Sequence, residues 1–406
     1  MENFKYIILG AGPAGLTFAN RLLALGETSF LVLEKDQEAG GLCKSKVVDG
    51  SPLDIGGGHF LEVKNRKALA FIFQFMPKAE WRQYHRVSTI RLDKSEIDYP
   101  FESNIWQFSI RNQLRYLYSI LTAGSVFGKP KPENFKDWII WKFGNQIARD
   151  YMIPYNEKVW SVNLKTMGTY WLNKLPKSSS KEIVLSYLQK KSKVAIPAHA
   201  LFYYPKNFGF GEVWKRMAKK LGNKIRYNEP IESIHVHNKI INGKYHGSFI
   251  ITTIPWRVVN FLPSIPDDIY QAIDSLQYSS IRVSYYPEQI QTHAQWTYVP
   301  NKSVSYHRCL YRSNFCTNAR GYWTETNKKR AELHSTRHQP FWINTFAYPL
   351  NTIKKLEATK MILTYFSNKQ IFGLGRWGEW EHMNSDIAVT KAIEMANAMD
   401  KKYHLL

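Results

Sequence analysis

Residues 6–34 constrain the fold of this chain more than any other stretch. An apolar run at 6–9 leads into Gly10-Ala11-Gly12-Pro13-Ala14-Gly15, and a second apolar run at 30–33 ends at Glu34. Apolar runs on either side of a glycine turn and an amphipathic segment predict a strand, a turn, a helix and a second, parallel strand. The stretch therefore predicts a βαβ unit.

Each glycine of this turn has a physical role if the ligand is a dinucleotide. Gly10 permits the sharp turn, Gly12 lets the backbone approach a pyrophosphate, and Gly15 lets the helix pack closely on the strand. The helix N-terminus then faces the phosphates. Glu34 stands where a carboxylate can hold a ribose hydroxyl, and Lys35 follows it. These residues predict a dinucleotide site, and the motif alone does not choose between FAD and NAD.

More glycines follow the second predicted strand, in Gly40-Gly41-Leu42 and in Asp54-Ile55-Gly56-Gly57-Gly58-His59. Glycines at this density let backbone amides approach a phosphate or a flat ring. For His59 the alternatives are contact with a flavin ring and an ordinary loop histidine. The cofactor-binding residues expected here are Gly41, Leu42, Gly57, Gly58 and His59.

Composition and cysteine usage indicate a folded protein of a reducing compartment. The 406 residues are 44% hydrophobic and 15% aromatic, which is enough for a sizeable core and two or three domains. Three cysteines make no disulfide framework. No apolar run approaches about 18 residues, and Glu2 and the glycine turn argue against a signal peptide. We expect a cytoplasmic protein with no transmembrane segment and no metal site.

The formal charge of +22 suits an anionic partner such as a membrane surface or a phosphorylated substrate. Basic residues are scattered, apart from a cluster at 190–193. A solvated lysine-rich surface is the plain interpretation, and attraction of an anionic substrate is the alternative. We expect no nucleic-acid partner.

Buried runs near Phe249 and Phe372 return the chain to the sheet of the βαβ unit, which makes FAD the better choice of dinucleotide. Hydrophobic periodicity then predicts an α/β protein: a discontinuous Rossmann-like FAD-binding domain, a helical insertion and an antiparallel β-sheet substrate domain. The first comprises 1–63, 205–262 and 368–406, the insertion is mainly helical over 64–204, and the sheet domain spans 263–367. Helices are expected at 68–76, 105–126, 135–143, 147–159, 212–221 and 387–399. A hairpin is expected within 87–98, and sheet strands at 281–286, 296–299, 303–311 and 342–348.

Two further motifs are more specific: Pro154-Tyr155-Asn156-Glu157-Lys158-Val159-Trp160 and Gly375-Arg376-Trp377-Gly378-Glu379-Trp380. With the glycine segments, Tyr204-Pro205, Tyr306 to Asn314 and Ala347-Tyr348-Pro349, they cover most of the chain. The sequence resembles the UDP-galactopyranose mutases, particularly the longer eukaryotic-type members. The glycine segments are shared with amine oxidases and protoporphyrinogen oxidases.

This resemblance implies an FAD enzyme that interconverts the pyranose and furanose forms of a nucleotide-linked sugar. The family uses reduced flavin as a covalent catalyst, with no net oxidation. The resemblance places His59 beside the isoalloxazine and Gly375 and Arg376 at the flavin. Arg308 and Tyr348 would contact the substrate diphosphate, and Trp160 would be a wall of the cleft. His59 and Arg308 are the expected catalytic residues. From the residues alone, other interpretations stay open. Arg308 could be an exposed strand arginine, and Tyr348 and Trp160 could serve only in packing.

Four positions depart from the family pattern, and they cluster where the family binds phosphate and sugar. Phe315 and His382 stand where tyrosines are usual, and Lys174 is the only cation near an expected second arginine. His199 aligns with a usual asparagine. All four are still expected to line the substrate site. FAD binding is therefore predicted more firmly than the particular sugar.

Two other functions stay open. One is a flavin oxidoreductase of the amine oxidase or protoporphyrinogen oxidase type, and the other is a flavin-free binding protein like the GDP-dissociation inhibitors. The intact Gly10, Gly12, Gly15 and Glu34 argue against the second. A mutase would also need a reductant, such as NAD(P)H or a reductase, and a homo-oligomer is an open expectation.

Overall fold

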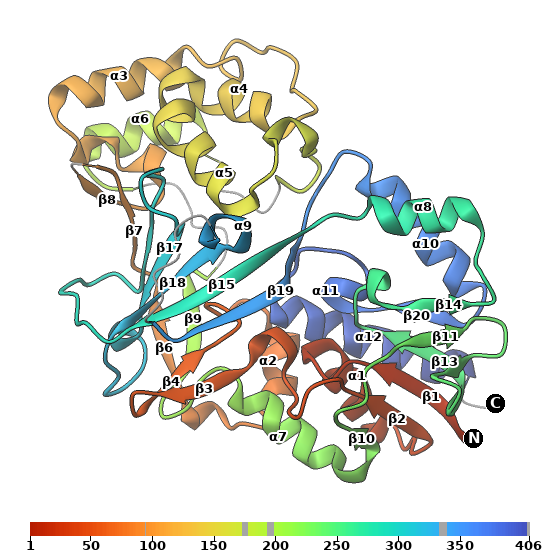
Figure 1. Cartoon of the computed structure of the whole chain (residues 1–406). Coiled ribbons are helices and arrows are strands. Elements are labelled where there is room, and N and C mark those ends of the chain that lie inside the picture. Colours follow the sequence, from red (N-terminus) through yellow and green to blue (C-terminus); the bar gives the residue numbers. More distant parts are fainter. Residues whose placement is uncertain (94, 173–177, 193–198, 333–338, 404–406) are drawn as a thin grey trace.

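A computed structural model describes residues 1–93, 95–172, 178–192, 199–332 and 339–403. The predicted βαβ unit is present, with β1 (Glu2–Leu9), α1 (Pro13–Ala24) and β2 (Phe30–Leu33). β1 pairs in parallel with β2 on one side and with β13 (Tyr245–Thr252) on the other. The unit thus lies at the centre of a larger sheet (Figure 1).

That sheet has eight strands among the described residues, and they come from three separate parts of the chain. Its path is β10-β2-β1-β13-β12-β11-β14, with β20 also paired to β13. The remaining bounds are β10 (Ile225–Arg226), β11 (Ser233–His235), β12 (Ile240–Ile241), β14 (Asn260–Leu262) and β20 (Ile371–Gly373). The discontinuous return to one sheet is what the buried runs near Phe249 and Phe372 predicted.

Helices cover both faces of this sheet. Alternate side chains of β1 point to opposite faces and therefore pack under different helices. Tyr6 and Ile8 join the core under α1, α7 (Glu212–Leu221) and α12 (Ser385–Tyr403). Ile7 and Leu9 join a second core under α8 (Asp267–Ser275) and α10 (Lys355–Ser367). Both faces of the sheet are therefore packed against apolar cores.

A seven-stranded, mostly antiparallel sheet stands beside the first (Figure 1). Its order is β19-β15-β18-β17-β16-β7-β8. The bounds are β7 (Ser88–Arg91), β8 (Glu96–Asp98), β15 (Tyr278–Tyr286), β16 (Trp296–Tyr298), β17 (Arg308–Tyr311), β18 (Tyr322–Asn327) and β19 (Phe341–Pro349). The strand expected at 303–311 forms only over its last four residues, and β18 was not predicted.

The segment 64–204 supplies strands as well as helices. The hairpin β7–β8 extends the second sheet. β9 (Leu201–Pro205) pairs with β5 (Leu61–Glu62) on one side and with β6 (Trp81–His85) on the other. Its helices are α2 (Arg66–Ile72), α3 (Ile110–Leu121), α4 (Phe135–Ile147), α5 (Ile153–Trp160) and α6 (Ser180–Gln189). A π-helical turn, Ala148–Met152, joins α4 to α5.

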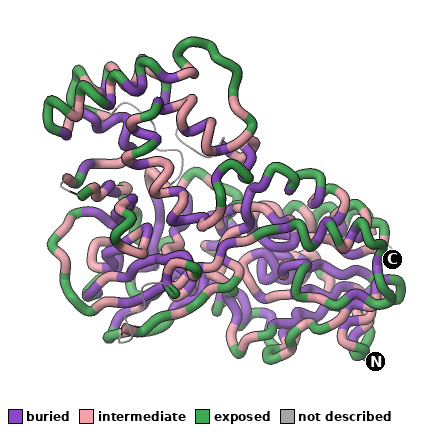
Figure 2. The backbone as a smooth tube through the Cα atoms, turned by 45° about the horizontal axis from the view of Figure 1, so that its top comes forward, coloured by how far each residue is buried: buried purple, intermediate pink, exposed green. Residues whose placement is uncertain are grey.

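α3 to α6 form the outer end of the molecule around a core of their own. Figure 2 shows buried residues within this end as well as in the sheets, with exposed residues in the outer turns. The short elements are β3 (Ser45–Val48), β4 (Ser51–Asp54), α9 (Lys328–Ala331) and α11 (Gly375–Gly378). No helix among the residues described has the length and hydropathy needed to span a bilayer.

Candidate active site

The glycine turn between β1 and α1 is closed by backbone contacts that a side chain would prevent. Gly10 has a φ of +98°, and its N–H donates to the carbonyl of Leu33 at 2.8 Å. A Cβ on Gly15 would lie 2.0 Å from the carbonyl oxygen of Gly10. The close approach of α1 to β1 therefore depends on Gly15, as predicted for a dinucleotide turn.

Glu34 holds this turn from the end of β2. Its buried carboxylate accepts from the Ala11 N–H at 2.8 Å and from the Asp36 N–H at 3.0 Å. Burial raises the pKa of the Glu34 carboxyl, and the two backbone donors oppose that shift. One carboxylate has about four lone-pair positions, so two backbone bonds leave capacity for a ligand hydroxyl.

A groove of about 590 Å³ runs from this turn toward the second sheet. Its walls are the glycine turn, the 41–43 loop, part of β19 and the start of α12. A volume in this range suits a cofactor-sized ligand. The predicted residues that line the groove are Gly10, Gly12, Glu34, Lys35, Gly41, Leu42, His59 and Arg376.

Two glycines face each other across one wall of this groove. A Cβ on Gly12 would have only the Cα of Gly41 within 4 Å, at 3.9 Å. Gly41 itself has a φ of +53°. Neither residue has a side chain in this wall, which lets a phosphate approach the amides at the start of α1.

His59 lies at the other end of the groove and is neutral. Its Nδ1 lies 2.8 Å from the carbonyl oxygen of Gly57, which can only accept, so Nδ1 carries the proton and Nε2 is an acceptor. Burial, followed by the nearby guanidinium of Arg376, lowers the pKa of His59 to about 3, and Arg308 contributes in the same direction. Two cations thus lie within electrostatic range of one neutral ring.

Arg308 is held by a buried carboxylate that the sequence did not point to. Its Nε and Nη2 donate to one oxygen of Glu325 at 2.9 and 2.5 Å, and the other oxygen accepts from the Gly58 N–H at 2.8 Å. The Glu325 side chain is fully buried, whereas that of Arg308 is 18% exposed. Glu325 therefore fixes both the arginine and the glycine segment that carries His59.

Aromatic rings form a wall around the second cation, Arg376. Its guanidinium lies 5.6 Å from the Tyr348 ring centre and donates to the carbonyls of Ala347 and Met383. Ring centres of Tyr348 and His382 are 5.1 Å apart, and Trp160 lies 6.0 Å from Tyr348 and 6.2 Å from His382. The structure thus brings together residues from α5, β19 and the segment after α11.

A family model described as flavin-containing amine oxidoreductase matches residues 13–286, more than half of the chain. This chain belongs to the flavin-containing amine oxidoreductase family. The glycine turn, the groove and His59 are therefore parts of a flavin-binding protein, and a flavin is the cofactor that the family supports.

Among curated proteins, a UDP-galactopyranose mutase of Mycoplasma pneumoniae is 32% identical over 128 residues, covering 31% of this chain and 29% of that protein. A putrescine oxidase of Kocuria rosea is 51% identical over 51 residues, covering 13% of this chain and 10% of the oxidase. The matched segments thus span less than a third of either relative.

Solved structures extend the likeness to the whole chain. A reduced UDP-galactopyranose mutase superposes with a TM-score of 0.88 at 22% identity, covering 99% of this chain and 96% of that one. A protoporphyrinogen oxidase structure from Exiguobacterium superposes with a TM-score of 0.71 at 11% identity, covering 99% of both chains. The resemblance identified from the sequence is confirmed for the fold.

Four more residues of the predicted site in this flavoprotein are Gly375, His199, Phe315 and Lys174. Gly375 has a φ of +75°, and a Cβ there would lie 2.6 Å from Ala14, so it brings α11 against the glycine turn. His199 has a φ of +54°, and its N–H donates to Glu62 at 2.6 Å. Phe315 is 1% exposed and packs in a core with Phe60 and Tyr204. Lys174 lies outside the described residues.

Sequence reasoning missed a third arginine of this region of the flavoprotein. The Arg86 guanidinium lies 4.4 Å from the ring centre of Tyr99 and 5.0 Å from that of Trp296, and it donates to the Tyr298 hydroxyl at 2.9 Å. Tyr298 also packs against Tyr155 of α5. No local motif marks Arg86, because two of its partners, Trp296 and Tyr298 of β16, are far along the chain, with Tyr298 212 positions away.

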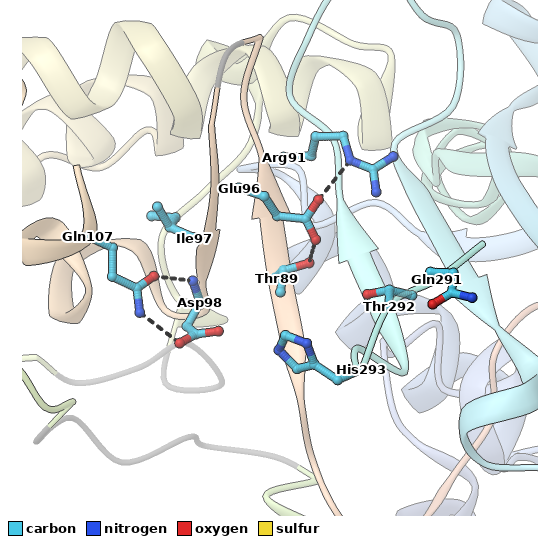
Figure 3. A pocket seen from close by; sticks show the side chains of 9 residues that line it. All are labelled: Thr89, Arg91, Glu96, Ile97, Asp98, Gln107, Gln291, Thr292 and His293. Carbon is cyan, nitrogen blue, oxygen red and sulfur yellow. Dashed lines mark hydrogen bonds and ion pairs between the residues drawn. The ribbon is translucent and has the colours of Figure 1, made fainter. Parts of the chain in front are cut away.

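A second cavity, of about 310 Å³, lies on the outer edge of the second sheet (Figure 3). Polar groups of its lining bond to one another: Glu96 accepts from Arg91 at 2.9 Å and from Thr89 at 2.6 Å. Gln107 donates to Asp98 at 2.7 Å. These mutually bonded polar groups, far along the sheet from the groove, point to surface structure and not to chemistry.

The neutral state of His59 predicts a pH dependence of folding stability. Its pKa is about 3 in the folded protein against an ordinary 6.5. Between these values the unfolded chain binds the proton and the folded chain does not, so stability is present above pH 6.5 and is lost as the pH falls toward 3. His59→Gln should reduce the slope of unfolding free energy between pH 7 and 5 by at most about 1.4 kcal/mol per pH unit.

Denaturant titrations of the flavin-loaded protein at pH 7, 6 and 5 measure this slope. The matched control is His237→Gln, because His237 is exposed in the turn between β11 and β12. The control should leave the slope unchanged. An equal slope for His59→Gln and the wild type would show that His59 takes up its proton over the same pH range in the folded and unfolded states, which would contradict the lowered pKa.

Proposed function

We propose that this protein is an FAD-dependent mutase that interconverts the pyranose and furanose forms of a nucleotide-diphosphate sugar. The default pair is UDP-galactopyranose and UDP-galactofuranose, and the FAD is in its reduced form. The proposal rests chiefly on Arg308, whose guanidinium is fixed by Glu325 at the His59 end of the flavin groove. A fixed guanidinium is suited to the oxygens of a diphosphate.

The shape of the groove supports FAD in particular. Glu34 and Lys35 line one end, the bare backbones of Gly12 and Gly41 follow, and His59 lines the other end. This order matches a ribose, a pyrophosphate and a ring system laid along one groove. The reduced flavin would supply the nucleophile for the anomeric carbon of the sugar.

The chain's own residues would bind and orient the substrate. Arg308 would hold the diphosphate, and Tyr348, with its hydroxyl, would add a donor beside it. Trp160 and His382 pack against Tyr348 and would exclude water from that wall. With Nδ1 bonded to Gly57, the Nε2 of His59 would accept a hydrogen bond near the reacting centre.

The positive charge of the chain fits this substrate class. A formal charge of +22 raises the local concentration of a dianionic nucleotide sugar by electrostatic steering. A cytoplasmic location, a reductant such as NAD(P)H or a reductase, and a role in galactofuranose supply for cell-surface polysaccharides are parts of the same proposal. His382 and His199 replace residues that are usual in the mutase family, so a panel of nucleotide sugars must be assayed to identify the sugar.

A second candidate is an FAD-dependent oxidoreductase of the amine oxidase or protoporphyrinogen oxidase type. The family model and the TM-score of 0.71 to a protoporphyrinogen oxidase structure favour it. In that case the flavin would accept a hydride and the product would leave oxidised. Arg308 keeps N–H donors beyond the two that it gives to Glu325, and these favour a substrate with phosphate oxygens and hence the mutase.

One assay separates the two functions. The flavin-loaded protein is reduced with dithionite and incubated with a panel of nucleotide sugars that includes UDP-galactose, and the products are separated by chromatography. We expect interconversion of pyranose and furanose forms with reduced protein and none with oxidised protein. If no nucleotide sugar isomerises, and an amine or porphyrinogen reduces the oxidised flavin instead, the oxidoreductase is the correct function.

A further inference from the structure

The outermost helix, α3, is fixed to the molecule by one face only. Ser119 on that face donates to the carbonyl of Phe143 at 3.0 Å and accepts from the Gln146 N–H at 3.0 Å. Tyr116 and Ile120 are buried beside it. Since these contacts hold the helix against α4, the orientation of its opposite face is fixed as well.

That opposite face is apolar and exposed to solvent. Ile110, Leu114, Tyr118 and Leu121 are 68%, 61%, 71% and 45% exposed. Their spacing of four, four and three residues aligns them in one stripe along the helix. A contiguous exposed apolar stripe, unlike a single exposed leucine, marks a surface that contacts another apolar phase.

The stripe is followed by an ordered apolar tip. Val126 and Phe127, in the turn after the helix, are 41% and 66% exposed. The turn is held by the Lys129 N–H bonded to the Gly124 carbonyl, and by the Trp141 indole, which donates to the Lys129 carbonyl at 2.8 Å. The tip is therefore exposed in a fixed conformation. We call the stripe and the tip together the α3 face.

Basic residues surround the α3 face. Residues 109–136 contain Glu133 as their one acidic residue and five basic residues, namely Arg111, Arg115, Lys129, Lys131 and Lys136. Two copies of such a face would repel each other, and the formal charge of +22 adds to that repulsion. Charge complementarity therefore favours an anionic partner over a second copy of this chain.

We propose that the α3 face docks on the surface of a lipid bilayer that contains anionic lipids. A convex helix with an apolar stripe and flanking arginines lies in the bilayer interface, with the stripe among the acyl chains and the cations at the headgroups. α3 is at the outer end of the molecule, away from the eight-stranded sheet (Figure 1). This surface is separate from the flavin groove, and the proposal does not depend on the reaction catalysed.

Co-sedimentation of the flavin-loaded full chain with lipid vesicles tests this. Vesicles of equal parts phosphatidylserine and phosphatidylcholine should bind the protein, vesicles of phosphatidylcholine alone should bind it weakly, and added salt should weaken binding. The double variant Leu114→Gln with Tyr118→Gln should bind the anionic vesicles at least about tenfold more weakly. Glutamine preserves helix propensity and adds no charge.

The matched control is Ile353→Gln with Leu356→Gln, since those two apolar residues are 51% and 53% exposed elsewhere on the molecule. It should bind as the wild type does. Equal binding by the α3 variant would show attraction by net charge alone and would overturn the proposal, as would a wild type that ignores anionic vesicles. A dimeric wild type that the α3 variant makes monomeric, measured by sedimentation velocity, would assign the face to self-association instead.

Discussion

Arg308→Ala should lower the turnover of nucleotide sugars by about 100- to 1000-fold while the protein keeps its flavin. Glu325 takes the Nε–H and one Nη2–H of Arg308 and so fixes its guanidinium at the His59 end of the groove, which would leave the other N–H groups for the diphosphate. Steady-state kinetics of the reduced protein measure the loss. The flavin absorbance spectrum shows whether the cofactor site is intact.

The same variant also removes the partner of a fully buried carboxylate. Glu325 would keep the Gly58 N–H but lose its cation, and breaking a buried pair in this way costs about 3–5 kcal/mol of stability. Arg308→Lys separates the two effects, because lysine keeps the positive charge but lacks the planar fork. We expect Arg308→Lys to recover most of the stability and little of the turnover.

Arg91→Ala is the matched control for Arg308. Arg91 pairs with Glu96 in the same sheet, at 2.9 Å, but on the outer hairpin. Its loss should leave turnover within about twofold of the wild type, because Arg91 does not line the groove. It should lower stability by only about 0–1 kcal/mol, since the pair is partly exposed. Full turnover in Arg308→Ala would remove Arg308 from the substrate site.

Gly12→Ala should produce a folded protein that binds flavin at least about 100-fold more weakly. A methyl group at Gly12 would meet nothing closer than the Cα of Gly41 at 3.9 Å, so the flavin-free fold can accommodate it. Gly12 lines the groove and is the N-cap of α1, where the change costs only about 0.5–1 kcal/mol. Because the pyrophosphate must approach this backbone closely, the methyl group would occupy its space.

Flavin titration by fluorescence measures the affinity, and denaturant unfolding of the flavin-free protein measures the stability. Gly243→Ala is a control with the reverse expectation. Gly243 has a φ of +67° in open space, so alanine there should lower stability by about 1 kcal/mol and leave flavin affinity unchanged. A Gly12→Ala protein with unchanged affinity would contradict the placement of the pyrophosphate.

Elements with a strong local pattern were predicted closely. The helix expected at 212–221 is α7 with the same bounds, and the βαβ unit and the return of its sheet near Phe249 are present. β18 was missed because its run, Tyr322–Asn327, is mostly polar and yet buried. Pairing with β15 and β17 satisfies its backbone, so tertiary contacts override the local preference.

The sequence by itself determined the glycine turn and the acid at Glu34, because these depend on residues close together in the chain and on backbone conformations that few residues adopt. It indicated the flavin family through a resemblance spread over most of the chain. Only the tertiary structure decided how the cations are held. The bond between Gly58 and Glu325 joins residues 267 positions apart, and Arg86 bonds to Tyr298, 212 positions away. Such contacts form only when distant parts of the chain pack together, so no local sequence pattern predicts them.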